Sequence, residues 1–334
     1  MHSQPSPTAA ASAGNASLRL LLAAAQLGHG AVIELVAAAA PDAISAADSD
    51  GKTALHHAAR AGQTASIRAL LAAAPDLVRT ADSRGSLALH SACSVASACG
   101  QQQAVMQLLA ADVSTATAVD SAGRTALHRA AESGHAAVIP QLLNAAPQTV
   151  TAGDSRGQLP LHAAIRASAY APIPLLLTAA PATILALDGY GATPLHAAAG
   201  VGRLPVVERL LALAPAAVRM PNSFGCLPIH YAARHNRLAV MRRLLASAPD
   251  TALTADNGGR VLLHFAAANG HASLIPDLLA AAPAAALVPD NDGRIPLELA
   301  LRSDAGLEPR LPAARSLLSY GPTSRVLAAV HGAG

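Results

Sequence analysis

The segment Asp188-Gly189-Tyr190-Gly191-Ala192-Thr193-Pro194-Leu195-His196 contains a phrase that recurs, with variations, along this chain. The phrase returns at six intervals of 34 residues and one of 38. Its glycines are Gly51, Gly85, Gly123, Gly157, Gly191, Gly225, Gly259 and Gly293. A fixed period of this size is typical of a solenoid, in which similar units stack and each contacts only its neighbours. We therefore expect one repetitive architecture that presents a long surface to another molecule.

Each unit is predicted to open with a turn. An Asp or Asn stands three residues before the glycine, where its side chain can accept hydrogen bonds from backbone amides two residues on. The glycine supplies a backbone conformation that a Cβ would penalise. The opening residues are Asp48, Asp82, Asp120, Asp154, Asp188, Asn222, Asp256 and Asp290.

Two short helices are predicted after the turn. Ala or Pro occupies the first helical position, where Pro has no amide hydrogen bond to lose. A glycine such as Gly62 then breaks the chain before a second helix that carries a Leu-Leu pair such as Leu70-Leu71. Ala-Pro follows, as at Pro75, and Pro cannot extend a helix. The pattern predicts an all-α fold with an antiparallel helix pair in each repeat.

These residues resemble the ankyrin repeat, whose consensus carries Asp-x-x-Gly-x-Thr-Pro-Leu-His-x-Ala-Ala, then Gly-His and a Val-Val-x-x-Leu-Leu helix. Gly134-His135 with Val138-Ile139 and Leu142-Leu143 follows that pattern closely. The resemblance covers eight repeats and, with degenerate caps, about nine tenths of the chain. It implies an ankyrin-repeat solenoid that forms a single elongated domain, with a β-turn and a helix pair per repeat.

The ends of the repeated phrase suggest the domain boundaries. The start of the chain is uncharged and rich in Ser, Ala and Pro, which is typical of disorder. At the other end Glu298 replaces the histidine of the phrase, as expected for a closing cap. We predict a disordered tail at 1–14, a degenerate capping helix pair at 15–47, seven repeats at 48–289, a capping repeat at 290–321 and a tail at 322–334.

The second repeat carries four extra residues, around Ser94 to Gln101. Four residues make about one turn of an α-helix, so we expect a lengthened helix or a bulging loop there.

Composition favours a protein of a reducing compartment, the cytoplasm or the nucleus. The three cysteines, Cys93, Cys99 and Cys226, cannot form a closed disulfide framework. The start of the chain lacks the basic segment and apolar run of a secretory signal. The uncharged stretch from Ala167 to Leu187 is long enough for a membrane span, but it contains three prolines and falls in register with one repeat. We expect repeat helices there rather than a transmembrane helix.

Seven histidines stand five residues after the turn glycines, and such a column raises the question of metal binding or acid–base catalysis. Packed helix layers lie about 10 Å apart, whereas zinc needs its ligands about 2 Å away. The column therefore predicts no metal site and no cofactor, and the resemblance implies bonds from each histidine to the backbone and to the Thr of the turn. These residues are His56, His90, His128, His162, His196, His230 and His264.

Other catalytic constellations are not expected either. The sequence has no phosphate-binding glycine loop, no nucleophile elbow and no His-Glu-x-x-His helix. Cys93 and Cys99 are interpreted as small core residues rather than a redox pair. An enzyme is therefore the least favoured class.

The partner-contact positions implied by the resemblance are strongly basic. They are the two residues after the Asp, the residue after the Gly, and the fourth and fifth residues after the His. The acidic residues at these positions are only Asp50, Glu132 and Asp292. The basic residues are Lys52, Arg60, Arg84, Arg124, Arg156, Arg166, Arg234, Arg260, Arg294 and Arg302. A concave face with this excess is predicted to attract an acidic or extended segment of another protein.

Two alternative roles for the arginines stay open. They could simply keep an alanine-rich surface soluble. Binding of nucleic acid is a weaker option, because aromatic platforms for bases are scarce and no basic run or recognition motif occurs.

Aromatic residues favour the protein-binding hypothesis. Tyr190 and Phe224 both stand directly before the turn glycine in adjacent repeats, and exposed aromatic side chains are favoured at binding hot spots. Tyr231 and Phe265 each follow the histidine and are interpreted as packing residues. The leading hypothesis is a monomeric, non-enzymatic adaptor or scaffold that binds its protein partner through repeats four to seven. The alternative is a regulatory subunit or inhibitor that blocks an enzyme or a channel.

Overall fold

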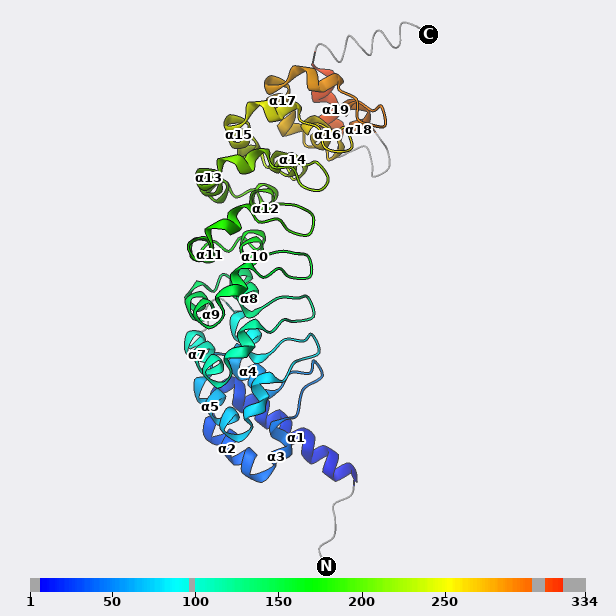
Figure 1. The fold of residues 1–334 in the computed structure, drawn as a ribbon. Coiled ribbons are helices and arrows are strands. Elements are labelled where there is room, and N and C mark those ends of the chain that lie inside the picture. The colour runs from blue at the N-terminus through cyan, green and yellow to red at the C-terminus, as the bar shows by residue number, and fades with distance from the viewer. Residues whose placement is uncertain (1–6, 96–99, 302–309, 321–334) are drawn as a thin grey trace, which may run out of the picture. The chain divides into compact units, whose positions relative to one another are not determined.

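The computed structural model describes residues 7–95, 100–301 and 310–320. Its helices divide into two compact units, Met1–Thr183 and Ile184–Gly334. Within each unit, helix pairs pack in series (Figure 1). In the described ranges the only extended pairing is an isolated bridge between Ala47 and Thr53. The predicted all-α ankyrin-type fold is confirmed.

The first unit begins with a long helix and two shorter ones and continues with four helix pairs. Its α-helices are α1 (Pro7–Leu27), α2 (Gly30–Ala39), α3 (Pro41–Ile44), α4 (Ala54–Arg60), α5 (Thr64–Ala73), α6 (Ala88–Cys93), α7 (Gln101–Ala111), α8 (Ala126–Glu132), α9 (Ile139–Ala145), α10 (Pro160–Arg166) and α11 (Pro172–Ala179). Its 3-10 helices are η1 (Pro75–Arg79), η2 (Val113–Thr117), η3 (Ala136–Val138) and η4 (Pro147–Thr151).

The second unit contains four further helix pairs. Its α-helices are α12 (Pro194–Val201), α13 (Leu204–Leu213), α14 (Pro228–Arg234), α15 (Leu238–Ser247), α16 (Leu262–Ala268), α17 (Ile275–Ala281), α18 (Pro296–Leu301) and α19 (Leu311–Leu318). Its 3-10 helices are η6 (Pro215–Arg219), η7 (Pro249–Leu253), η8 (Ala272–Leu274) and η9 (Pro283–Leu287), while η5 (Pro181–Leu185) contains the boundary between the units.

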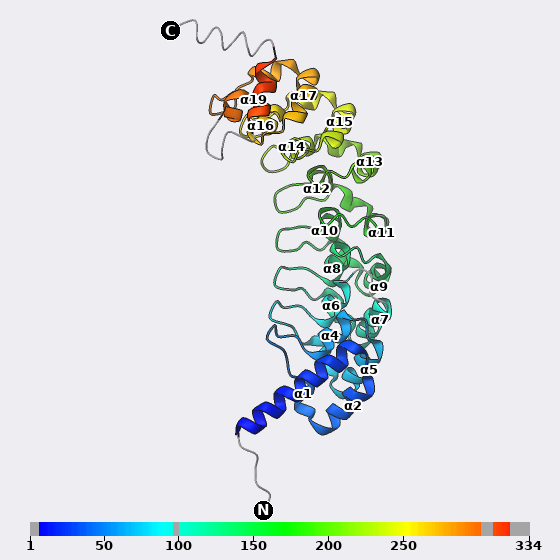
Figure 2. The same cartoon turned by 180° about the vertical axis from the view of Figure 1, so that it is seen from behind.

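Within each unit, the first helices of successive repeats pack on one another, and so do the second helices. In the first unit α4 packs on α6, α6 on α8 and α8 on α10, as Figure 2 shows from behind, while α5 packs on α7 and α7 on α9. In the second unit α12, α14, α16 and α18 form the equivalent row. Alanines such as Ala58 and Ala59 are fully buried and allow this close approach. Fully buried leucines such as Leu55 and Leu70 fill the core, each worth about 1.5–3 kcal/mol.

Within each unit, backbone hydrogen bonds join each turn to the next one. In the third repeat, Asp120 Oδ1 accepts from the backbone N–H groups of Ala122 at 2.9 Å and Arg124 at 3.0 Å. Gly123 has a φ of 73°. The Ser155 N–H of the following repeat then donates to the Ala122 carbonyl over 2.9 Å. The turns therefore present their tips side by side, in a fixed register, along each unit.

The structure differs from the sequence-based expectations at several places. Helix α1 begins at Pro7, inside the segment predicted to be a tail, because the alanine-rich residues that follow favour a helix. A five-residue 3-10 helix follows each Ala-Pro stop, as in η1 and η4, because Pro fits the first position of a new helical turn. These short helices were not predicted from the sequence.

The ends and the insertion are described only in part. Glu298 in α18 accepts a hydrogen bond from the Ile295 N–H at 2.8 Å through Oε2, in the place of the missing histidine. The extra residues of the second repeat lie between α6 and α7, and residues 96–99 are outside the described ranges, as are 1–6, 302–309 and the predicted tail 322–334.

The uncharged stretch 167–187 is occupied by repeat elements. It holds α11 and η5 together with the short connections before and after them. Within the described residues, no helix combines the length and the apolar character needed to cross a membrane.

Candidate functional site

Within each unit, the column of histidines ties repeats to their neighbours. His128 shows the arrangement: the Thr125 N–H donates to its Nδ1 at 3.2 Å, and its Nε2 lies 2.9 Å from the carbonyl oxygen of Gln158 in the following repeat. Because Nδ1 accepts a hydrogen bond, we assign the proton to Nε2, which donates to the carbonyl. Equivalent ties run from His56 to Ser86, His90 to Arg124, His196 to Cys226 and His264 to Arg294. His230 differs, because its Nε2 lies 3.0 Å from the carbonyl oxygen of Thr254, just before the following turn.

Burial keeps these rings neutral. Desolvation disfavours a charged imidazole, and it lowers the ring pKa below its usual value at five positions. These are His56, His90, His128, His230 and His264. In His162 the Nδ1 likewise accepts from the Leu159 N–H, at 3.3 Å. Across the described ranges, no group of three or more His, Cys, Asp or Glu side chains is arranged to hold a metal ion. The geometry supports a structural role for the column.

Three of the predicted contact arginines bind the turn aspartate of their own repeat. Arg260 Nη2 lies 2.6 Å from Asp256 Oδ2, and Arg294 Nη2 lies 2.9 Å from Asp290 Oδ2. Arg124 Nε lies 3.1 Å from Asp120 Oδ2. Burial alone would raise the pKa of these carboxyl groups, but backbone hydrogen bonds and the guanidinium groups outweigh it and lower the pKa. Part of the positive charge counted in the sequence is therefore balanced within the turns.

Five predicted contact arginines are exposed and have no such partner, among them Arg60. Within the described part of the chain, no carboxylate forms an ion pair with its guanidinium group or with those of Arg84, Arg156, Arg166 or Arg234. Arg302 lies outside the described residues. Unpaired guanidinium groups keep their full capacity for two-bond contacts with carboxylates or phosphates.

The turn-tip aromatics of the second unit lie against each other. Tyr190 and Phe224 are 53% and 55% exposed. Their ring centroids are 6.3 Å apart and their planes are inclined by 29°, in a stacked arrangement. Two adjacent exposed rings form an apolar platform on an otherwise polar row of turns.

A hollow of about 200 Å³ lies beside Phe224. Its walls include the rings of Tyr231 and Phe265 and the side chains of Arg234 and Arg260. The guanidinium carbon of Arg260 is 4.9 Å from the centre of the Phe265 ring, a cation–π contact. A second hollow of about 240 Å³ shares Arg234, Arg260 and Phe265 with the first.

Two of these wall residues were not predicted from the sequence to belong to a site. Tyr231 and Phe265 do pack, as interpreted, since they contact the rings of His196 and His230 edge-on at 5.3 Å and 5.4 Å. They also line the hollow. The sequence signal that could have identified them is their spacing of 34 residues, which puts both directly after the histidine in neighbouring repeats.

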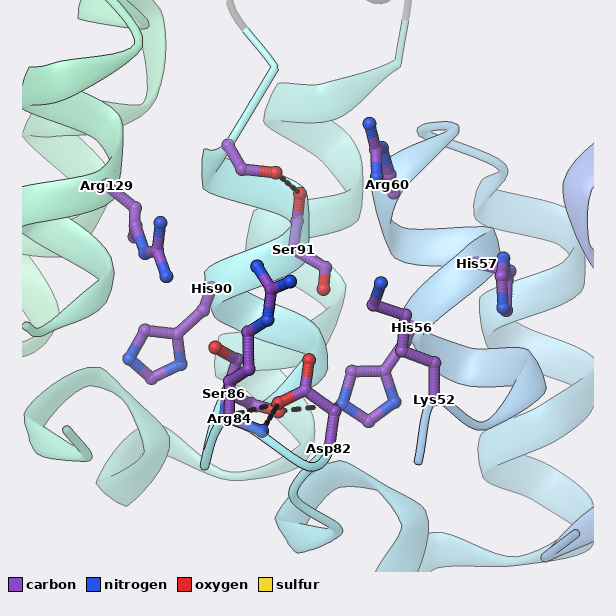
Figure 3. A pocket seen from close by; sticks show the side chains of 11 residues that line it. Lys52, His56, His57, Arg60, Asp82, Arg84, Ser86, His90, Ser91 and Arg129 are labelled. Carbon is purple, nitrogen blue, oxygen red and sulfur yellow. Dashed lines mark hydrogen bonds between the residues drawn. The ribbon is translucent and has the colours of Figure 1, made fainter. Parts of the chain in front are cut away.

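A third hollow, of about 270 Å³, lies in the first unit and is lined mainly by basic and hydroxyl side chains. Figure 3 shows Arg60 and Lys52 to one side of Ser91, Arg129 to the other, and Arg84 rising from the turn between them. Of the residues named as contact positions by the sequence, the structure brings Lys52, Arg60 and Arg84 together here. Arg129 joins them although no sequence pattern marked it.

The described cysteines are buried free thiols. Burial raises the pKa of the Cys93 thiol above its ordinary range. Burial, together with nearby Asp256, raises the pKa of Cys226 to about 11. Both are therefore protonated and poorly nucleophilic at neutral pH. Cys99 lies outside the described residues, so the suggested pair with Cys93 has no described geometry.

Comparison with protein-family models finds the model for ankyrin repeats three times, at residues 10–115, 94–186 and 173–255. Comparison with curated proteins finds no significant match. The predicted turn phrase continues beyond the last matched residue, at Gly259 and Gly293. Proteins built from these repeats generally act as protein–protein interaction modules and are generally not enzymes.

Proposed function

The chain belongs to the ankyrin repeat family, and we propose that it is a non-enzymatic interaction module that binds an acidic, extended segment of a partner protein. The proposed binding face lies in the second unit. It consists of the turn-tip pair Tyr190 and Phe224, the two hollows beside them, and the arginines that line those hollows. This face is called the aromatic face below.

The observation that carries the proposal is the combination of exposed rings and unpaired positive charge at one place. Phe224 belongs both to the stacked pair and to the wall of the first hollow. Arg234 lines both hollows and is exposed. Aromatic and arginine side chains around a pocket are the residue types most enriched at protein-binding hot spots.

The chemistry of this face favours a segment that mixes acidic and apolar residues. An apolar side chain can enter the hollow between Phe224, Tyr231 and Phe265, where it removes exposed ring surface from water. A neighbouring carboxylate can then receive two hydrogen bonds from the Arg234 guanidinium. Arg260 contributes less, because Asp256 and the Phe265 ring already engage it.

The test uses a fluorescein-labelled degenerate peptide library, rich in Asp and Glu, with a fixed central Phe. The combined change of Tyr190→Ala and Phe224→Ala should weaken binding at least tenfold, equivalent to about 1.4 kcal/mol. The thermal midpoint should stay nearly unchanged, because both rings are exposed. Arg234→Glu should slow association and reduce its salt dependence.

The matched control combines Leu213→Ala with Leu253→Ala. These leucines are also large, apolar and exposed, at 49% and 46%, but neither lines a hollow of the aromatic face. The control should bind the library as the wild type does. Wild-type binding by the Tyr190 and Phe224 double variant would show that this face is not the binding surface.

A further inference from the structure

The hollow of the first unit exists because the second repeat carries two small residues where its neighbours carry large ones. Ser86 follows the turn glycine, and Ser91 follows the histidine. Both serines line the hollow. At the same two positions the flanking repeats carry Lys52 and His57 on one side, and Arg124 and Arg129 on the other. Short hydroxyl side chains therefore form the floor between long basic ones, and we call this site the basic hollow.

Two of its four cationic side chains are not used within the protein. Lys52 Nζ lies 3.0 Å from Asp50, and Arg129 Nη2 lies 2.7 Å from the buried Asp120. No carboxylate in the described residues forms an ion pair with Arg60 or Arg84, and both are exposed. These two guanidinium groups are available to a ligand.

Only one carboxylate lines the basic hollow. Asp82 is buried, and its Oδ1 accepts from the backbone N–H groups of Arg84 at 2.9 Å and Ser86 at 2.8 Å. In the first and third repeats the second oxygen of the turn aspartate holds the basic side chain that follows the histidine: Asp48 Oδ2 lies 2.8 Å from His57 Nε2, and Asp120 Oδ2 lies 2.7 Å from Arg129 Nη2. Ser91 replaces that basic side chain here, and in the described residues neither Arg60 nor Arg84 forms an ion pair with Asp82, which lies at the base of the hollow (Figure 3).

We propose that the basic hollow binds a phosphorylated serine or threonine side chain of a partner protein. A phosphoryl group carries about −1.5 to −2 charges at pH 7 and three strong acceptor oxygens. Guanidinium groups from different repeats reach the hollow from different sides, which matches a tetrahedral anion better than a flat carboxylate that one guanidinium fork satisfies. The Ser91 hydroxyl adds a neutral donor. The inference rests on the proposed function, since the phosphoryl group belongs to a protein partner.

The size and lining of the hollow favour a protein ligand over nucleic acid. Its volume of about 270 Å³ accommodates a phosphoryl group with part of its side chain. Single-stranded nucleic acid is usually held by aromatic platforms along an extended basic groove. The described residues that line the basic hollow include no Phe, Tyr or Trp, and its basic side chains come from three successive repeats around one hollow.

The test measures binding of labelled peptides to the full chain by fluorescence anisotropy. The probes are a degenerate library with a fixed central phosphoserine and the same library with a central serine. Wild type should prefer the phosphoserine library at least tenfold, and millimolar inorganic phosphate should compete. Arg60→Gln combined with Arg84→Gln should weaken phosphoserine binding at least tenfold without lowering the thermal midpoint, because both side chains are exposed.

The control variant combines Arg156→Gln with Arg166→Gln. These arginines occupy the same two positions of the fourth repeat, are exposed and change the net charge equally. The control should bind the phosphoserine library within twofold of wild type. Equal losses in the two variants would overturn the proposal, because they would point to a diffuse positive field. Equal binding of the two libraries would overturn it as well.

Two further binding measurements distinguish this inference from nucleic-acid binding and from failure of the proposed function. Tighter binding of a labelled single-stranded oligonucleotide, dependent on Arg60 and Arg84, would replace the phosphoprotein ligand with nucleic acid and overturn the proposal. The acidic library with central Phe is tested on the same preparations. If the Tyr190 and Phe224 double variant binds the acidic library as the wild type does, while phosphoserine binding still requires Arg60 and Arg84, then the aromatic face is wrong and the basic hollow is retained. If only phosphoserine recognition fails, the basic hollow is wrong and the proposed function stands.

Discussion

At the scale of single residues, the turn glycine meets two separate requirements. Gly123 has a φ of +73°, a conformation that L side chains rarely adopt. A Cβ at this position would also lie 2.7 Å from the backbone nitrogen of Ser155 in the next turn. Gly134, which breaks the two helices of the same repeat, has a φ of +75°, but a Cβ there would meet only the Ala169 methyl group at 3.6 Å. A comparison of Gly123 with Gly134 therefore distinguishes the cost of backbone strain from the cost of a clash between two repeats.

We expect Gly123→Ala to destabilise the protein more than Gly134→Ala. The second change costs about 1–2 kcal/mol from the left-handed conformation alone. Gly123→Ala adds a backbone clash that forces adjacent turns apart, which lowers the free energy of unfolding by roughly 1–3 kcal/mol more. Urea unfolding of both variants measures the difference. Equal losses would mean that the turns do not need their close backbone approach.

At the scale of the elements, the start of each first helix is also the joint between repeats. His128 lies in the first turn of α8, and its two ring nitrogens hold Thr125 in its own repeat and Gln158 in the next. The resemblance implied the bond to the turn. The tie to the following repeat became visible only in the structure, because it depends on how two repeats stack.

Replacing His128 should lower the free energy of unfolding more than replacing a buried histidine that does not link two repeats. His128→Ala leaves the Gln158 carbonyl and the Thr125 N–H without their partner, for about 1–3 kcal/mol. His135 is the control, since it is 5% exposed and its Nδ1 has no hydrogen-bond partner in the described structure. Thermal unfolding of His128→Ala and His135→Ala compares the two. If His135→Ala lowers thermal stability as much as His128→Ala does, the hydrogen bond between repeats is not a source of stability.

The arginines show the same dependence on packing. Arg84 and Arg124 both sit beside a turn glycine, one before it and one after it. Arg124 curls back onto Asp120, because the side chain after the glycine reaches the aspartate of its own turn, as it does in Arg260 and Arg294. Arg84 instead lines the basic hollow. The position relative to the glycine therefore separates these two roles, whereas a total count of basic contact positions does not.

At the scale of the whole molecule, the buried histidines make stability depend on pH. Their pKa values in the folded protein lie below the ordinary value of 6.5 at His56, His90, His128, His230 and His264. Above pH 7 the rings are neutral in both states. Below pH 6.5 the unfolded chain binds protons that the folded chain does not, so the free energy of unfolding falls as the pH falls.

The thermal midpoint should therefore drop between pH 7 and pH 5. Each ring contributes up to about 1.4 kcal/mol per pH unit in this range. Carboxyl groups with a lowered pKa, such as Asp120 and Asp256, lose their stabilising effect as the pH falls further toward and below their ordinary value of 3.8. Circular dichroism melts at pH 7, 6 and 5 measure the effect, and His128→Ala should show a shallower decline. A midpoint that stays constant over this range would contradict the neutral assignment of the column.

The amino-acid sequence by itself determined the fold class, the family and the order of turn, helix, break and helix. Those features follow from interactions within one repeat or between neighbours: the Asp-to-glycine turn, Pro at the helix start, and leucines at helical spacing. Two features were not predicted from the sequence: the start of α1 at Pro7 and the 3-10 helix after each Ala-Pro. Both depend on weak local propensities.

Only the tertiary structure decided which residues are free to meet a partner. Whether an arginine is paired, as Arg260 is, or open, as Arg234 is, depends on which carboxylates its guanidinium group can reach in the folded chain. The hollows depend on side-chain sizes in two or three successive repeats at once. Ser91 became part of a site because long side chains flank it. A single repeat contains neither the neighbours nor the space between them, so its residues alone cannot specify a binding site.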